Sequence, residues 1–180
     1  MKKTLPLLAL AFCGLAQAGD LTGAIGDGYG FVSRTPSSGG LGLTFDYVKS
    51  SDSNAKGSKP EAAGLGLVFS IPVSNVRFDL GGKAMYLDSD GSATAAMVGG
   101  RVNLELPMQT ELFGQAYWTP DSLASGSVHK VTDYMAGVRW KPIKLVGVEA
   151  GWRRFEIERD DSSRSGKAAD GAYIGVSVGF

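Results

Sequence analysis

Apolar and polar residues alternate along most of the chain beyond residue 40. Residues 41–47 show the pattern, because Leu or an aromatic residue stands at every second position and Gly, Thr or Asp stands between them. A period of two indicates an extended strand with one apolar and one polar face. The pattern predicts eight such strands, at residues 41–49, 62–71, 76–87, 94–106, 110–118, 131–141, 145–157 and 171–180.

Three prolines mark turns between these strands. Pro72, Pro107 and Pro142 stand 35 residues apart in both intervals, and each lies between two alternating runs. Because proline has no N–H to donate to a strand ladder, each indicates a tight hairpin turn. The other connections are longer and rich in Asp, Ser and Gly, as in "KSSDSNAKGSKPE" and "ERDDSSRSGKAAD". Short turns that alternate with longer polar loops are typical of an up-and-down membrane barrel.

Aromatic residues lie near both ends of the apolar strand faces. A soluble β-sandwich would scatter them through its core, whereas a membrane barrel carries an aromatic girdle at each interface. The sequence therefore predicts an all-β fold over residues 41–180: an eight-stranded antiparallel transmembrane β-barrel with four outer loops, closed between the first and last of these strands. The expected membrane-interface aromatics are Tyr47, Tyr86, Trp118, Tyr134 and Trp152 near the loops, and Phe69, Phe78, Trp140 and Phe180 near the turns.

The polar strand faces carry charges of both signs. Eight strands would enclose them in a lumen only wide enough for side chains. A selective pore more often shows an excess of one sign, so a near-balanced set indicates ion pairs that fill the lumen; a narrow or gated channel is the alternative. The expected lumen ion-pair network consists of Arg77, Lys83, Arg101, Arg139 and Arg153 with Asp46, Asp79, Glu105, Glu111, Asp133 and Glu149.

Residues 1–18 have the features of a secretory signal peptide. Two lysines precede an apolar run, and the sequence "AQA" provides a small-residue cleavage motif before Gly19. Removal of this segment takes away Cys13, the only cysteine, so the exported chain folds without disulfides. It also leaves 16 basic against 18 acidic residues, which argues against nucleic-acid binding. The remaining length suits one domain.

The Gly-rich residues 19–40 do not fit the eight-strand scheme. They are expected to form an extra strand, a periplasmic extension or an insert into the lumen. As a lumen insert they would add Asp27 and Arg34 to the charge network. Their "GDGYG" run is superficially similar to a phosphate-binding loop, but no strand-to-helix context follows it, which argues against nucleotide binding.

The predicted outer loops contain the few residues that suggest chemistry. His129, the only histidine, lies close in sequence to Ser125, Ser127 and Asp133, and these residue types serve in acyl transfer. Ser-rich loops supply such neighbours by chance, so a solvated histidine is the simpler interpretation. The "DSDG" run at 88–91 lacks the remaining ligands of a calcium loop, so no metal and no cofactor are expected. Lipopolysaccharide phosphates could meet the basic loop residues Lys49, Lys56, Lys59, Arg159, Arg164 and Lys167.

In size, strand count, Pro-marked turns and terminal Phe180, the chain resembles the small outer-membrane barrels of Gram-negative bacteria, and within them the YfaZ family. The final strand "AYIGVSVGF" also resembles the C-terminal signal that the barrel-assembly machinery recognises. The resemblance brings no catalytic residues with it. It implies an outer-membrane location and contacts with outer-membrane lipid and lipopolysaccharide.

Together these observations predict a monomeric, non-enzymatic structural or surface-interaction barrel with a salt-bridged lumen. A small porin-like channel for ions or small solutes is the alternative. A lipid-modifying enzyme is the third possibility, and His129 would be its candidate residue.

Overall fold

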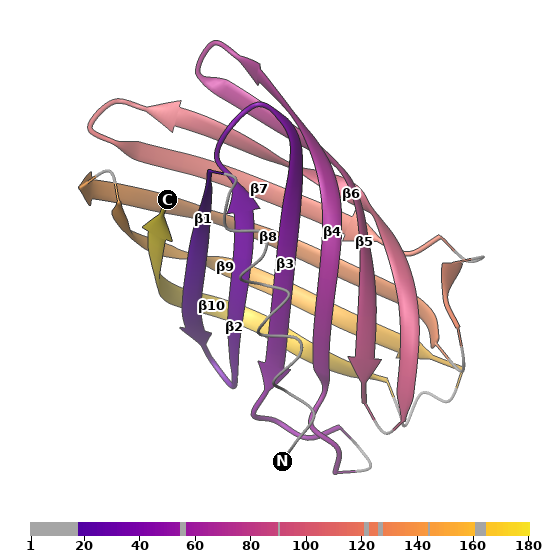
Figure 1. Cartoon of the computed structure of the whole chain (residues 1–180). Helices are drawn as coiled ribbons and strands as arrows, with labels where there is room; N and C mark the ends of the chain where they lie inside the picture. Colours follow the sequence, from indigo (N-terminus) through magenta and orange to yellow (C-terminus); the bar gives the residue numbers. More distant parts are fainter. Residues whose placement is uncertain are drawn as a thin grey trace.

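A computed structural model describes residues 18–54, 57–89, 91–120, 123–125, 128–143, 145–160 and 165–180. These residues form one closed sheet of ten antiparallel strands, rolled into a barrel (Figure 1). None of them forms a helix long and apolar enough to cross a membrane. The strands are β1 (Gly19–Gly26), β2 (Tyr29–Pro36), β3 (Gly40–Ser50), β4 (Glu61–Val73), β5 (Val76–Asp88), β6 (Ser92–Leu106), β7 (Thr110–Trp118), β8 (Val128–Ile143), β9 (Val146–Arg159) and β10 (Gly166–Gly179).

The eight strands predicted from the alternation correspond to β3 to β10, but the predicted strand count is wrong. Residues 19–40 contribute two further strands to the wall, so the barrel has ten. One end of the barrel, which we call the loop end, is marked by the strand ends at residues 26 and 29, 50 and 61, 88 and 92, 118 and 128, and 159 and 166. These five pairs of strand ends replace the four outer loops that were predicted. The opposite end is the turn end.

The glycines of β1 and β2 explain why the alternation pattern did not predict these two strands. Glycine is depleted in strands and has no side chain to show which face is apolar, so the alternation is weak in "GDLTGAIG". The connecting residues Asp27 and Gly28 nevertheless form a common two-residue hairpin signal. Gly28 has a φ of 73°, a left-handed conformation that glycine adopts without a steric penalty. The similarity of this run to a phosphate-binding loop therefore reflects a hairpin turn.

The barrel closes between its first and last strands. β10 pairs with β1 from Asp20 opposite Gly179 to Gly26 opposite Tyr173. The Gly19 amide donates to the Phe180 carbonyl at 2.9 Å, and the Phe180 amide donates back at 3.0 Å. The predicted closure onto the strand at 41–49 is wrong, because β1 and β2 lie between that strand and β10.

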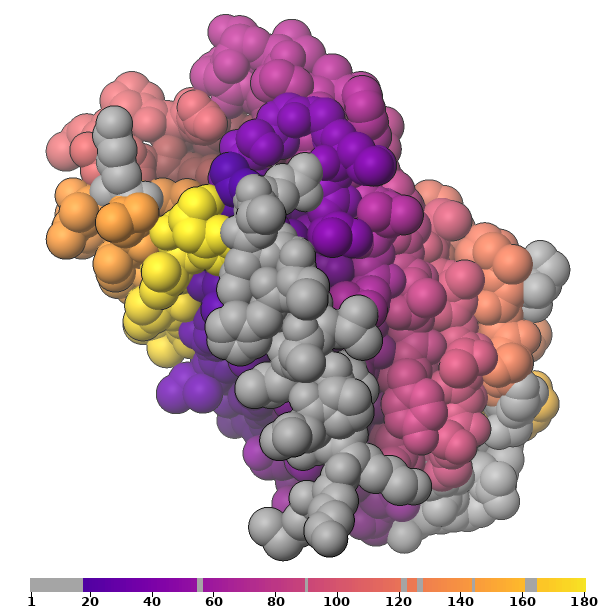
Figure 2. All heavy atoms as spheres, viewed as in Figure 1, coloured from indigo at the N-terminus to yellow at the C-terminus, as the bar shows by residue number. Residues whose placement is uncertain are grey.

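The distribution of side chains is the reverse of that in a soluble protein. Ile174, Val176 and Val178 of β10 are about half exposed, whereas Arg139 and Arg153 are at most 1% exposed. In the space-filling view, the atoms of β4, β5 and β6 form a continuous outer wall (Figure 2). An apolar exterior around a charged interior is the arrangement that a lipid bilayer stabilises.

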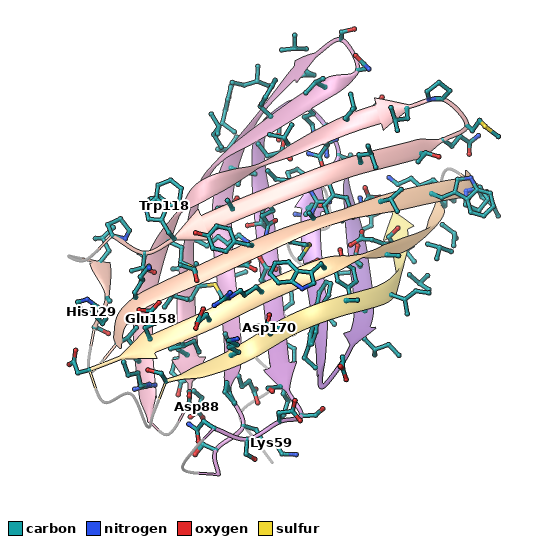
Figure 3. All side chains as sticks on the ribbon, turned by 180° about the vertical axis from the view of Figure 1, so that it is seen from behind. Lys59, Asp88, Trp118, His129, Glu158 and Asp170 are labelled. Carbon is teal, nitrogen blue, oxygen red and sulfur yellow. The ribbon has the colours of Figure 1, made fainter. Side chains whose placement is uncertain are left out.

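Eight of the nine expected interface aromatics lie on this outer face and are at least 40% exposed. Trp118, for example, projects outward from the wall (Figure 3). Tyr47 is half-buried, and its hydroxyl donates to Glu61 Oε1 at 2.9 Å. Tyr86, Trp118 and Tyr134 lie in the loop half of their strands, and Phe69, Phe78, Trp140 and Phe180 lie near the turn end. Trp152, expected near the loops, lies in the middle of β9.

The lumen contains two layers of side chains. Toward the loop end it is filled by an apolar cluster, whose fully buried members include Val48, Leu87, Val131, Phe155 and Ile157. Toward the turn end it is filled by charged groups. The eight-strand prediction expected a lumen filled by charged side chains alone. It did not distinguish the inward residues near the loop end from the inward residues near the turn end.

A pair of cysteines should test the ten-strand closure, since the sequence beyond Cys13 has no cysteine of its own. Leu21 of β1 lies directly opposite Val178 of β10. Directly opposed residues have Cα atoms about 4.5–5.5 Å apart, within disulfide range. Leu21→Cys with Val178→Cys should therefore form a disulfide on mild oxidation, detected by intact mass.

The control combines Leu43→Cys with Val178→Cys. Two strands, β1 and β2, separate these positions, so both thiols should stay free. A disulfide in the control and none in the first pair would contradict the ten-strand barrel.

Candidate functional site

Ten of the eleven charged residues expected in the lumen are buried there. Glu105 differs, because it is exposed at the turn end of β6, opposite Glu111 in the β6–β7 register. At this rim water can solvate the Glu105 carboxylate, so it needs no partner. The ten buried residues, none more than 8% exposed, are Asp46, Arg77, Asp79, Lys83, Arg101, Glu111, Asp133, Arg139, Glu149 and Arg153.

Arg139 of β8 joins carboxylates from three other strands. Its Nε and Nη2 donate to Glu149 Oε2 of β9 at 2.8 and 2.5 Å. Its Nη1 lies 3.1 Å from Asp20 Oδ2 of β1 and 3.5 Å from Glu111 Oε1 of β7. The Tyr173 hydroxyl of β10 donates to the other Glu149 oxygen at 2.7 Å. One guanidinium thereby ties together distant parts of the wall.

Arg153 of β9 is the centre of a second cluster. Its Nε and Nη2 donate to the two oxygens of Asp133 at 3.0 and 3.1 Å, a bidentate geometry. Arg153 Nη2 also lies 3.4 Å from Asp46 Oδ1, and Lys83 Nζ lies 2.5 Å from the other Asp46 oxygen. Gln115 donates to Asp133 Oδ2 at 3.0 Å. Two cations and two carboxylates are therefore held in one buried, nearly neutral group.

An amide connects the third cluster. Asn103 donates to Asp79 Oδ2 at 2.9 Å and accepts from Arg101 Nε at 2.7 Å. Arg77 Nε lies 3.3 Å from Asp79 Oδ1. Arg101 Nη2 lies 3.9 Å from Glu111 Oε1. Asn103 thus bridges a guanidinium and a carboxylate that do not meet directly.

Glycine makes room for aromatic rings that support these cations. A Cβ atom at Gly137 would lie 2.8 Å from the Phe113 ring, which is too close for a real side chain. The same holds at Gly99, where it would lie 2.9 Å from the Tyr117 ring. The Arg101 guanidinium carbon lies 3.8 Å from the centre of the Phe113 ring. Such a cation–π contact stabilises a cation that has few carboxylate partners.

Sequence reasoning missed two charged members of the network. Lys141 Nζ lies 2.7 and 2.8 Å from the two oxygens of Asp20. Lys141 could have been found, since it stands two residues after Arg139 on the same strand face. Asp20 could be placed only after β1 was recognised as a strand. With both included, six cations and six carboxylates share the lumen.

The two charged residues proposed for a lumen insert belong to the β1–β2 hairpin of the wall. Asp27 lies in the β1–β2 turn at the loop end. Arg34 pairs in register with Leu21, and its buried side chain donates from Nη1 to the Leu43 carbonyl at 2.6 Å.

The charged and apolar layers leave little free space between them. A cavity of about 10 Å³ lies in the lumen beside Thr44, Asp46, Asp79 and Lys83. That volume corresponds to about one water molecule. The charged residues of the site therefore neutralise one another, and the cavity beside them has room for about one water molecule.

The loop residues considered for acyl transfer are dispersed. His129 lies at the loop end near Glu158, outside the lumen (Figure 3). Asp133 is inside the lumen and bound by Arg153, and four residues along a strand separate it from His129 by about 13 Å. Ser125 bonds to Thr94, while Ser127 lies outside the described residues. In the described part of the chain, no group of three or more His, Cys, Asp or Glu residues is placed to hold a metal.

Replacing Arg139 by Met should destabilise the barrel by about 3–5 kcal/mol, because three buried carboxylates lose their shared cation. The matched control is Lys130→Met. Its ion pair with Glu158 is 3.7 Å long and about half exposed on both sides, so its loss should cost less than about 1 kcal/mol. Urea unfolding in lipid vesicles would measure both. Equal midpoints for the two variants would show that the lumen pairs contribute no more than surface pairs.

Comparison with protein families, known sequences and solved structures identifies proteins that are similar to this barrel. The family model described as YfaZ precursor matches residues 16–180. Outer membrane protein YfaZ of Escherichia coli (strain K12) is 32% identical over 155 residues, which cover 85% of this chain and 81% of that protein. Among solved structures, an anion-selective porin from Comamonas acidovorans has a TM-score of 0.39 and 14% identity over 84% of this chain. The chain spans 47% of the porin's length.

The family match and the E. coli relative confirm the resemblance drawn from the strand pattern and the terminal Phe180. The protein is an outer-membrane β-barrel exported with a signal peptide. Longer loops of such barrels face outward, so the loop end is external and the turn end faces the periplasm. The chain belongs to the YfaZ family.

Proposed function

We propose that this protein is a sealed, non-enzymatic barrel with a structural or surface-interaction role in the outer membrane. The observation that carries the proposal is the filling of the lumen. An ion entering from outside first meets the buried apolar layer around Phe155 and Ile157. Beyond it lies the charged layer, where carboxylates and cations already neutralise one another.

The charged layer would resist ions of either sign. To pass, an ion would have to displace partners such as the bidentate Asp133 from Arg153, leaving a buried charge unpaired. Removing one partner of a buried ion pair costs about 3–5 kcal/mol. Because several pairs stand in series, the balanced network favours a closed lumen over a selective pore.

Planar-bilayer recording on the refolded mature protein should therefore show no discrete openings. A heat-dependent gel shift first confirms that the barrel is folded, and a known porin in the same bilayer serves as the positive control. Arg153→Ala should also be silent, because the apolar layer near the loop end is left in place. Reproducible unitary steps from the wild type would reject the sealed barrel in favour of the porin-like alternative.

We propose further that the protein does not modify lipids. The candidate residue His129 is exposed, and the groups it would need are elsewhere in the fold. Incubation with lipopolysaccharide or phospholipid should release no fatty acid, for the wild type and His129→Ala alike. Acyl release that disappears in His129→Ala would overturn this proposal.

The proposed partners of the outer surface are lipopolysaccharide head groups. The exposure of two lysines at the loop end supports this: the side chains of Lys49 and Lys167 are 53% and 44% exposed, although each also pairs with a carboxylate. Arg159 is buried and donates to the Gly91 carbonyl, so it is not a surface group as expected. Lys56 and Arg164 lie outside the described residues.

Two further proposals concern assembly. Phe180 would serve as the contact for the barrel-assembly machinery, supported by its place at the end of the closing strand. We also propose that the protein is monomeric, since one chain closes the whole ladder.

A further inference from the structure

The barrel wall is irregular near the loop end, between β6 and β7. The β5–β6 ladder continues to Ser92, but the β6–β7 ladder stops where Val98 pairs with Trp118. The part of β6 nearest the loops therefore has no partner on β7. In lipid, unpaired backbone groups cost several kcal/mol each, so something must cover this edge.

Residues 123–125 cover part of it. Ala124 forms an isolated antiparallel bridge with Ala95 of β6. The Ser125 amide donates to the Thr94 carbonyl at 2.9 Å, and Ser125 Oγ accepts from the Thr94 amide at 3.1 Å. We call this segment the strap. It is hydrogen-bonded to the edge of β6 that β7 leaves, and Ala124 packs against the buried apolar cluster.

A groove of about 700 Å³ lies between the strap and strands β4, β5 and β6. Small outward residues Ala63, Ala84 and Ala96 give it depth, and Ala84 and Ala96 are direct register partners. Larger side chains flank these alanines: Leu65, Tyr86 and Leu123. The volume is within the range of about 300–1,000 Å³ typical of small-ligand sites.

The position of the groove identifies its occupant. It belongs to the apolar outer face, so hydrocarbon rather than water surrounds it. It begins in the row of Ala63 and Tyr86, at the external aromatic girdle, and continues one row deeper, about 7 Å, to Ala84. An apolar chain that enters from the external interface would fit this course.

We propose that the groove binds one acyl chain of a lipopolysaccharide molecule in the external leaflet. Lipopolysaccharide occupies that leaflet, and the groove is continuous with the barrel's lipid-facing surface. His129 and Lys130, both exposed, lie at the loop end of β8, the strand that follows the strap in the sequence, and the half-exposed Lys130 can meet lipopolysaccharide phosphates there. The proposal rests on the proposed contact between the outer surface and lipopolysaccharide, and it does not depend on whether the lumen conducts.

The test counts lipid that stays on the folded barrel. The mature protein is refolded with equal amounts of lipopolysaccharide and phosphatidylethanolamine, extracted in mild detergent and examined by native mass spectrometry. The wild type should retain one lipopolysaccharide molecule. Leu123→Asp places a charge at the groove, outside the strands, and should lower retention at least about tenfold, a loss equivalent to about 1.4 kcal/mol.

The matched control is Leu145→Asp, another exposed leucine outside the strands, at the turn end. It should retain lipid like the wild type. A second pair fills space instead of adding charge: Ala96→Trp should lower retention, and Ala150→Trp, on the outer face of β9, should not. The heat-dependent gel shift confirms folding of each variant.

Three results would overturn the proposal. The first is a wild-type barrel that retains no lipid. The second is retention of phosphatidylethanolamine in place of lipopolysaccharide, which would remove the assignment to the external leaflet. The third is equal retention by Leu123→Asp and Leu145→Asp, which would place the bound lipid elsewhere on the wall.

Discussion

The structure depends on pairing every backbone amide and carbonyl that faces hydrocarbon. A sheet satisfies this requirement only when its first and last strands meet, and here β1 meets β10. The closing ladder extends past β10 itself, since Phe180 is hydrogen-bonded to Gly19. The same requirement explains the strap, because the one stretch of β6 that lacks β7 acquires a different partner.

Strand number sets the second constraint, the width of the lumen. Barrel diameter grows roughly linearly with strand number, so ten strands enclose a space about a quarter wider than eight. This chain fills that space with long side chains. Arginine, tyrosine and phenylalanine reach toward the axis, and inward glycines such as Gly99 and Gly137 provide room for the rings. The result is a packed interior in which charge and aromatic surface alternate.

Strands could be predicted from the sequence wherever large side chains distinguish the apolar face of a strand from its polar face. The strands from β3 to β10 carry a large apolar residue at nearly every second position, and their period of two survives small errors of register. The buried charges were found for the same reason. Asp20 was missed because its strand is interrupted by glycines, which show no face, although Asp27-Gly28 marked the turn. The apolar layer around Phe155 was missed because inward apolar residues interrupt the alternation near the loops.

The contact between β1 and β8 in the lumen bears on how the barrel assembles. Asp20 lies 119 residues before Arg139 and 121 before Lys141, yet it neutralises both. A partly inserted sheet made of the later strands would hold these two cations without that carboxylate, and burying them would be unfavourable. Glu149 and Glu111 would still pair with Arg139, but the pairing of the lumen charges is completed only when β1 brings Asp20. Insertion is thereby made cooperative, and a half-built barrel has little thermodynamic reason to persist in the bilayer.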